Sequence, residues 1–183
     1  MTVPALLGPV GAEELVGFLN TRDPATGADL LVGAGRANRW LRSHRLLPAD
    51  EQLGDAEVLR ARRARELLRG LAMATPAGRA DAVDIELLER AAARIRYGVS
   101  IGAEGSPALQ VLTRGVDGVL GRLVLGVLRA RVERSWTRIK VCGNPECGRV
   151  FLDASRNRSR SWCDMATCGN QAKARSFRRR HAR

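Results

Sequence analysis

The chain has 183 residues, of which 45% are apolar and 4% aromatic, and its formal net charge is +12 with an isoelectric point near 11.2. This apolar share excludes a disordered protein, and the length allows one core, or a core with a small added module. The excess of positive charge favours a polyanionic partner, either nucleic acid or an anionic membrane surface. The chain has no run of 18 apolar residues and no basic N-terminal region of a signal peptide, so we expect a cytoplasmic protein without a membrane span.

Apolar residues at helical spacing predict four helices in the first half of the chain. These helices cover residues 11–24, 28–48, 54–76 and 81–94. Asp29 is the expected N-cap of the second helix and Asp55 that of the third. In the third helix the expected apolar stripe is Val58, Leu59, Leu67, Leu68 and Leu71, whereas Arg60, Arg62, Arg63 and Arg65 lie mostly outside it.

The next segment changes period. Residues 94–102 alternate between apolar and other side chains, as in a half-buried strand, and residues 107–112 can return as the second strand of a hairpin. A long helix is predicted over residues 115–133, where Gly118, Gly121 and Gly126 indicate close packing against a neighbour. Residues 134–140 then connect to a strand. The sequence therefore predicts an α+β, mainly α fold, with a helical domain over residues 1–133 that contains one small β-hairpin.

All four cysteines lie in the last quarter of the chain, as two pairs with four residues inside each pair and fifteen between the pairs. They are Cys142, Cys147, Cys163 and Cys168. Four thiolates complete a closed tetrahedral zinc site, so we expect one structural Zn²⁺ held by this second module, over residues 138–183. Disulfides, a redox pair and an iron–sulfur cluster are the alternatives, and reducing conditions in the cytosol argue against the first of them.

The expected shape of this module is treble-clef-like. A turn joins the first two cysteines, the spacer forms a hairpin with residues 149–153 as one arm, and a helix follows Cys168. Phe177 and Trp162 are expected in the core of the module.

Positive charge is concentrated in the module. Residues 141–183 hold ten basic and three acidic side chains, and four thiolates with one Zn²⁺ would leave a net charge of +5 on these 43 residues. The other 140 residues carry the same net charge. An extended segment over residues 156–160 would place its three arginines on one side, where they could contact phosphates. The predicted nucleic-acid contacts are Arg156, Asn157, Arg158, Arg160, Lys173, Arg175, Arg178, Arg179 and Arg180. The alternative is that these arginines offset the zinc–thiolate charge or remain solvated.

The C-terminal residues "CGNPECGRVFLDASRNRSRSWCDMATCGNQAKARSFRRR" resemble the CGNR zinc finger, whose name describes the residues at its last cysteine. Gln171 stands here where that family has arginine. The segments "FLNTR" (residues 18–22) and "DLL…WLRSHRLLP" (residues 29–48) resemble the ABATE domain that accompanies this finger, in proteins described as stress-induced transcription regulators. The resemblance implies DNA binding by the finger and a sensing or interaction role for the helical part.

Asn20, Thr21, Arg22 and Trp40 fall within the same N-terminal segments, where they could line a small-molecule pocket. The competing interpretation is that Asn20 and Thr21 cap helices and that Arg22 pairs with an acid such as Asp29.

We therefore expect a zinc-dependent DNA-binding transcription regulator, with a homodimer through the helical domain as a further hypothesis. The alternative function is an RNA-binding or protein-interaction adaptor. An enzyme is not expected, because the two histidines and the absence of a phosphate loop or nucleophile elbow leave no catalytic constellation.

Overall fold

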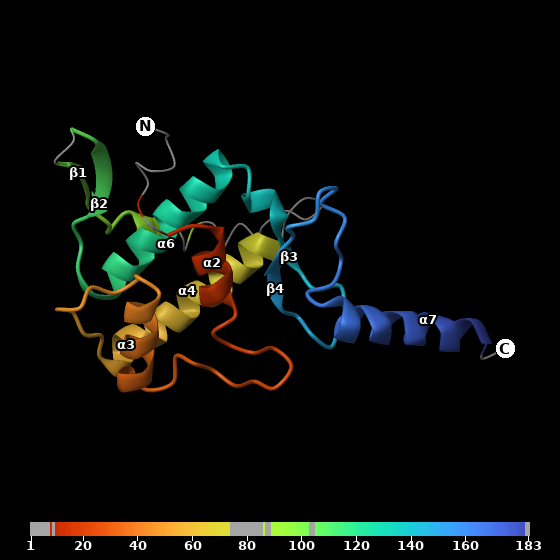
Figure 1. The fold of residues 1–183 in the computed structure, drawn as a ribbon. Coiled ribbons are helices and arrows are strands. Elements are labelled where there is room, and N and C mark those ends of the chain that lie inside the picture. The colour runs from red at the N-terminus through yellow and green to blue at the C-terminus, as the bar shows by residue number, and fades with distance from the viewer. Residues whose placement is uncertain (1–7, 9, 74–85, 87–88, 103–104, 182–183) are drawn as a thin grey trace.

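The computed structural model describes residues 8, 10–73, 86, 89–102 and 105–181 (Figure 1). Its N-terminal elements are α2 (Ala12–Leu19), α3 (Ala34–Ser43), α4 (Asp55–Met73), β1 (Tyr97–Ile101), β2 (Pro107–Val111) and α6 (Gly115–Val132). They are followed by the 3₁₀ turn η1 (Trp136–Arg138), β3 (Ile139–Val141), β4 (Val150–Leu152), the π-helical turn η2 (Met165–Gly169) and α7 (Asn170–His181). In the part of the chain that is described, no helix combines the length and apolar character needed to cross a membrane.

The N-terminal core lies where α2, α4 and α6 pack together, in the middle of the view in Figure 1. Phe18, Leu41, Val119 and Leu123 are almost inaccessible to solvent there. Each comes from an apolar position at helical spacing, so the fold class and most of the helices predicted from the sequence are confirmed.

The second predicted helix begins later than expected. It starts at Ala34 after Gly33, and the prediction of Asp29 as its N-cap is wrong. The Asp29 carboxylate instead accepts hydrogen bonds from both terminal nitrogens of Arg65, at 2.8 and 2.9 Å. The Asp29 carboxylate therefore binds a buried arginine of α4 and does not cap the amides at the start of α3.

Burial along α4 also differs from the predicted stripe. Leu59 is 46% exposed, whereas Arg65, expected outside the stripe, is only 1% exposed. The arginine tolerates burial because Asp29, Glu66 and the Thr21 hydroxyl all accept hydrogen bonds from it. Of the helix predicted over residues 81–94, residues 86 and 89–92 are helical, residues 93–94 form a turn, and the remainder lies outside the described residues.

The predicted hairpin is confirmed as the antiparallel pair β1 and β2, which packs beside α6. Close approach depends on two of the glycines of α6. A Cβ at Gly121 would lie 2.7 Å from Val111 Cγ1 and 2.8 Å from Ile95 Cγ2, and a Cβ at Gly126 would lie 2.7 Å from Val10 Cγ1. The close packing expected from these glycines is therefore present.

A second hairpin, β3–β4, joins the cysteine module to the helices. Residues 150–152 form a strand as predicted, but their partner is Ile139–Val141, before the first cysteine, and not a segment of the spacer. Ile139, Val150 and Trp136 belong to the same buried cluster as the side chains of α2, α4 and α6. The strands pair across the first two cysteines because their apolar side chains can then enter this existing core.

Replacing Gly121 with alanine tests this packing. We expect Gly121→Ala to lower the free energy of unfolding by about 1–2 kcal/mol, because the clash with Val111 and Ile95 outweighs the gain in helix propensity. Gly35→Ala on α3 is the matched control, since its Cβ would meet only the end of the Arg39 side chain at 3.8 Å, and it should stabilise the protein slightly. Equal stabilisation by both substitutions, measured by urea denaturation, would contradict the close approach.

Candidate metal centre and basic surface

The four cysteine sulfurs lie within 4.8 Å of one another. Cys147 Sγ is 3.6 Å from Cys163 Sγ, which is 3.7 Å from Cys168 Sγ. In a regular tetrahedron with Zn–S bonds of about 2.3 Å, the sulfurs are about 3.8 Å apart, so these separations fit one zinc ion. They are too long for disulfides, which need about 2.05 Å, and all four cysteines are free thiols. The cluster is a binding site for a single zinc ion, as predicted from the spacing.

The protonation of these thiols depends on their surroundings. Burial raises the pKa of Cys147 and, more strongly, the pKa of Cys163. The side chain of Asn144 lowers the pKa of Cys168 to about 7. Without a cation, the cluster therefore retains protons at neutral pH, and a bound Zn²⁺ would displace them as it draws the four thiolates together.

Asn144 connects the turn between the first two cysteines to α7. Its side chain is almost completely buried, donates a hydrogen bond to Gln171 Oε1 at 3.0 Å and accepts one from Arg175 at 2.6 Å. Arg175 also pairs with Glu146 at 3.2 Å. Gln171, which replaces the arginine of the motif, thus supplies the acceptor that the Asn144 amide needs. Arg175, predicted to contact nucleic acid, is engaged in holding the turn against α7.

The N-terminal helices hold the residues that directly follow this turn. Asn20, at the end of α2, donates to the Val150 carbonyl at 2.7 Å and accepts from the Val150 amide at 3.0 Å. Arg69 of α4 donates to the carbonyls of Gly148 and Leu19, at 2.7 and 3.1 Å. We call these contacts of Asn20 and Arg69 the inter-module clamp. It fixes the metal-binding turn to both helices.

Comparisons with known families agree with this architecture. A family described as "putative stress-induced transcription regulator", ABATE, matches residues 15–137, which is more than half of the chain. This chain belongs to the ABATE family. The CGNR zinc finger matches residues 138–181, so the zinc site and α7 fall within a recognised zinc-binding module. A search of curated proteins gave no match.

In this ABATE protein, a buried carboxylate organises the arginine-rich loop after β4. Asp153 is completely buried and accepts hydrogen bonds from Lys140 Nζ at 2.6 Å, from the Ser155 amide and hydroxyl at 2.9 and 2.5 Å, and from the Arg160 amide at 3.0 Å. Burial opposes its ionisation, but the bonds from Lys140 and Ser155 outweigh burial and lower its pKa far below the usual range. An acid within a strongly basic stretch was the only sign of this role in the sequence.

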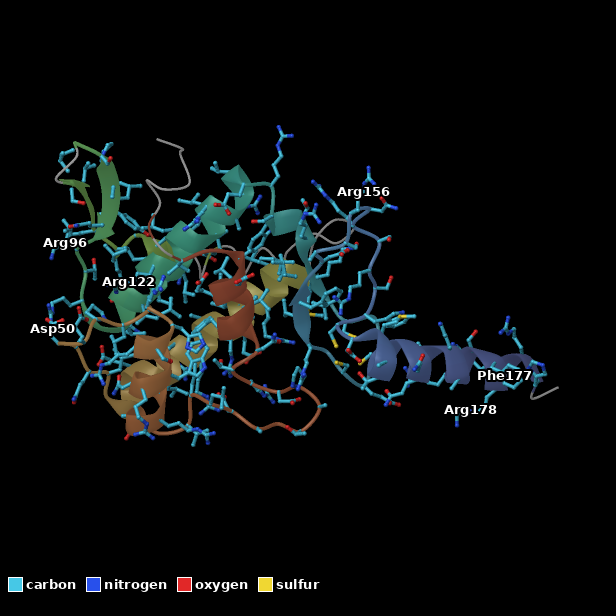
Figure 2. The ribbon with its side chains drawn as sticks, viewed as in Figure 1. Asp50, Arg96, Arg122, Arg156, Phe177 and Arg178 are labelled. Atoms are coloured by element: carbon cyan, nitrogen blue, oxygen red, sulfur yellow. The ribbon has the colours of Figure 1, made fainter. Side chains whose placement is uncertain are left out.

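The expectation of an extended segment over residues 156–160 is wrong. Residues 156–157 form a turn, and Arg158 has a positive φ of 52°. The Arg160 side chain folds back to donate to the carbonyls of Trp162 and Cys163 and lies over the Phe151 ring. Arg156 remains exposed at the tip of the loop (Figure 2). The three arginines therefore do not form one face, because hydrogen bonds to Asp153 curl the loop.

The basic residues of α7 are mostly free. Lys173, Arg178, Arg179 and Arg180 are exposed, and none of them forms a salt bridge with an acid among the described residues. The helix contains no buried residue and projects away from the rest of the protein (Figures 1 and 2). Phe177, predicted in the module core, is 56% exposed and stacks on His181 of the same helix, because no other described element packs against this part of α7. Trp162 is only partly buried, beside the turn that holds Cys142.

The residues predicted for a small-molecule pocket near the N-terminus have other contacts. Asn20 belongs to the inter-module clamp, and the Thr21 hydroxyl donates to the Phe18 carbonyl at 2.7 Å while accepting from Arg65. Arg22 lies 3.9 Å from Glu66 and pairs with Asp29 only through its backbone, and Trp40 stacks on His44. The capping interpretation of Thr21 is thus closer to its observed role than a ligand contact.

Zinc content is the first test of the metal centre. We expect one zinc ion per chain by mass spectrometry under native conditions, and an affinity that rises with pH between about 5.5 and 8, because binding must displace protons from Cys147 and Cys163. Cys163→Ser should abolish stoichiometric binding, whereas the neighbouring Ser161→Ala should leave it unchanged. Full zinc retention by Cys163→Ser would contradict the four-sulfur site.

The role of Asp153 gives a second test. Asp153→Asn should lower the free energy of unfolding by about 2 kcal/mol, because the amide cannot replace a carboxylate that accepts several hydrogen bonds, one of them from a lysine. Asp50→Asn removes an exposed ion pair with Arg114 and should change stability by less than about 1 kcal/mol. Equal effects of the two substitutions in urea denaturation would rule out an organising role for Asp153.

Proposed function

We propose that this protein is a zinc-dependent DNA-binding transcription regulator that contacts duplex DNA through α7 and through Arg156 in the adjacent loop. The helical N-terminal domain would act in sensing or oligomerisation. The proposal is supported by membership of the ABATE family and by the CGNR zinc finger. The single observation that carries it is a projecting helix on which Lys173, Arg178, Arg179 and Arg180 are exposed and form no salt bridge with a described acid.

The dimensions of α7 suit the major groove. Twelve residues at about 1.5 Å each make a helix about 18 Å long, and the major groove of B-DNA is about 12 Å wide. Because none of its residues is buried, the helix can enter a groove without unpacking from the protein. The zinc ion would fix its first turn, since Cys168 lies in η2, which leads directly into α7.

A groove beside the helix could hold the DNA backbone. It has a volume of about 470 Å³ and lies between the first cysteine turn and α7. Arg178 and Arg179 line it together with Trp162 and Pro145. Guanidinium groups above an apolar floor can bind phosphate in bidentate fashion while the floor contacts the sugar. In this arrangement Arg160 and Arg175 support the surface, and Arg156, Lys173 and Arg178–Arg180 make the contacts.

RNA binding is the main alternative, and the exposed ring of Phe177 favours it over a protein partner. An accessible aromatic side chain on a basic surface can stack on an unpaired base. Competition between duplex DNA, structured RNA and single strands separates the two functions. We also propose that the protein is not an enzyme.

The salt dependence of binding tests the contact surface. For the zinc-loaded protein on duplex DNA, each phosphate contact should add about −0.9 to the slope of log K against log salt concentration. Arg178→Ala combined with Arg179→Ala should weaken binding and reduce the magnitude of the slope by about 2, measured by fluorescence anisotropy.

The matched control removes the same charge from the N-terminal helices. Arg39→Ala combined with Arg63→Ala changes two exposed arginines of α3 and α4 and should leave the slope nearly unchanged. If both double variants lose the same affinity, the net charge and not α7 determines binding. If neither variant changes it, α7 is not the contact surface.

A further inference from the structure

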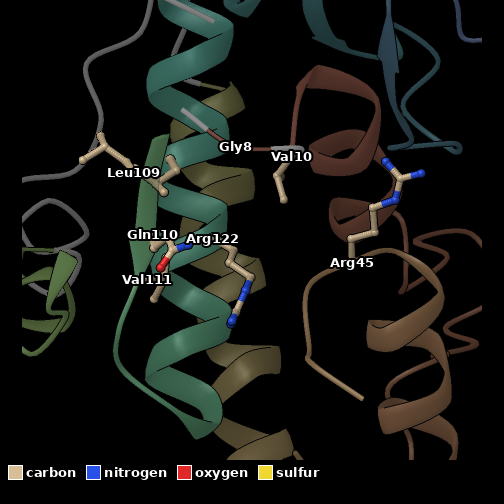
Figure 3. Close-up of a pocket in the computed structure, with 8 residues that line it drawn as sticks. Gly8, Val10, Arg45, Leu109, Gln110, Val111 and Arg122 are labelled. Atoms are coloured by element: carbon tan, nitrogen blue, oxygen red, sulfur yellow. The ribbon is translucent and has the colours of Figure 1, made fainter. Parts of the chain in front are cut away.

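A cavity of about 260 Å³ lies on the N-terminal domain, away from the zinc site. Its walls come from α6, from β2, from the segment after α3 and from the residues just before α2. Val10, Val111 and Leu125 supply apolar surface, and Arg45 and Arg122 supply two positive charges. Figure 3 shows Arg122 on α6 and Arg45 on the opposite side, with Val10 between them. This cavity was not predicted from the sequence.

Arg122 is a half-buried cation without an acidic partner among the described residues. Within the described parts of the chain, its guanidinium forms one hydrogen bond, a long one of 3.5 Å to the Leu46 carbonyl. Burial lowers its pKa, and the negative charge of Glu51 only partly offsets this effect. The contrast with Arg65 is informative, because that buried arginine is matched by carboxylates on two residues. A guanidinium with most of its donors unused, at the edge of a cavity, is suited to an anion that enters from solution.

Arg45 lies on the facing wall, and its exposed side chain, whose guanidinium is turned away from Arg122 in Figure 3, can supply a second charge by rotating toward the cavity. Its backbone φ of 59° lies in the left-handed region, which is unfavourable for a residue with a side chain and follows directly after the C-cap of α3 at His44. The side chain is exposed, and no hydrogen bond or ion pair holds it within the described parts of the chain. This φ belongs to the end of α3, where the amides of Arg45 and Leu46 donate to the carbonyls of Arg42 and Leu41, and it directs the exposed Arg45 side chain away from the helix.

We propose that this cavity binds a small organic anion, a monocarboxylate of about six to eight non-hydrogen atoms in all, with an apolar chain. The volume equals that of about nine water molecules at 30 Å³ each. The carboxylate would lie against Arg122 and Arg45, and the apolar part would lie against Val10, Val111 and Leu125. A phosphate dianion fits less well, because much of the wall is apolar and offers few further donors.

The inference is independent of DNA binding. The cavity contacts α6 and β2, not α7, so an anion could bind whether or not the zinc module recognises nucleic acid. If both proposals hold, the cavity is the sensing site of the regulator.

Hexanoate and its neutral counterpart hexanamide are suitable probes, used with the full-length zinc-loaded protein. We expect hexanoate to raise the melting temperature in a saturable manner, by several degrees when its concentration reaches about 100 times Kd. It should also shift the NMR signals of Val111 and Leu125 methyl groups. Hexanamide should bind with less than a tenth of the affinity of hexanoate. Equal binding of both probes, or no saturable binding of hexanoate up to 10 mM (about the weakest affinity expected of an eight-atom ligand), would overturn the proposal.

Arg122→Met retains the length of the side chain and removes the charge. It should weaken hexanoate binding at least tenfold and raise the melting temperature of the free protein, because an unpaired half-buried cation is lost. Arg39→Met, which removes an exposed arginine of α3, should leave both quantities unchanged. If Arg122→Met does not fold, Arg45→Met provides the same binding comparison. Unchanged affinity in the folded variant would assign the binding to another site.

Discussion

The inter-module clamp is the constraint on which the rest of the structure depends. Asn20 pairs with both backbone groups of Val150, as a neighbouring strand would, and Arg69 satisfies carbonyls on either side of the junction. The apolar side chains of β3 and β4 add to this contact by entering the helical core. The turn that carries Cys142 and Cys147 is therefore held in place by contacts with α2 and α4 in addition to the cysteine cluster.

This arrangement explains why the zinc module can carry an unsupported helix. On one side of the metal site, the hairpin is anchored in a hydrophobic core. On the other side, Asn144 and Arg175 hold only the first turns of α7, and the later turns have no contacts that bury side chains. A helix that is held rigidly at its first turn and exposed along its later turns has the geometry needed to enter a groove of DNA.

The arginines of this protein divide into three groups with different physical roles. Arg65 is neutralised in the interior and Arg69 holds backbone carbonyls, whereas Arg160 and Arg175 shape the zinc module. Those at the end of α7 have no acidic partner in the described chain and provide the basic surface. Arg122 represents the third group, because it is partly desolvated and has no carboxylate partner among the described residues. Net charge alone could not separate these groups, because a count assigns the same value to a buried ion pair and a free cation.

The sequence by itself determined the helices of the core, the β1–β2 hairpin and the four zinc ligands, because each follows from periodicity or spacing along a short segment. Most of the core of α6 could be predicted, including the need for glycine at Gly121. Only the tertiary structure decided that Ile139–Val141 pairs with β4, that Asp29 pairs with Arg65 instead of capping a helix, and that Asp153 curls the arginine loop. In each case the residue has several possible partners in the sequence. Spacing along the chain does not determine which partner it contacts, because only the folded chain brings one of them within hydrogen-bonding or packing distance.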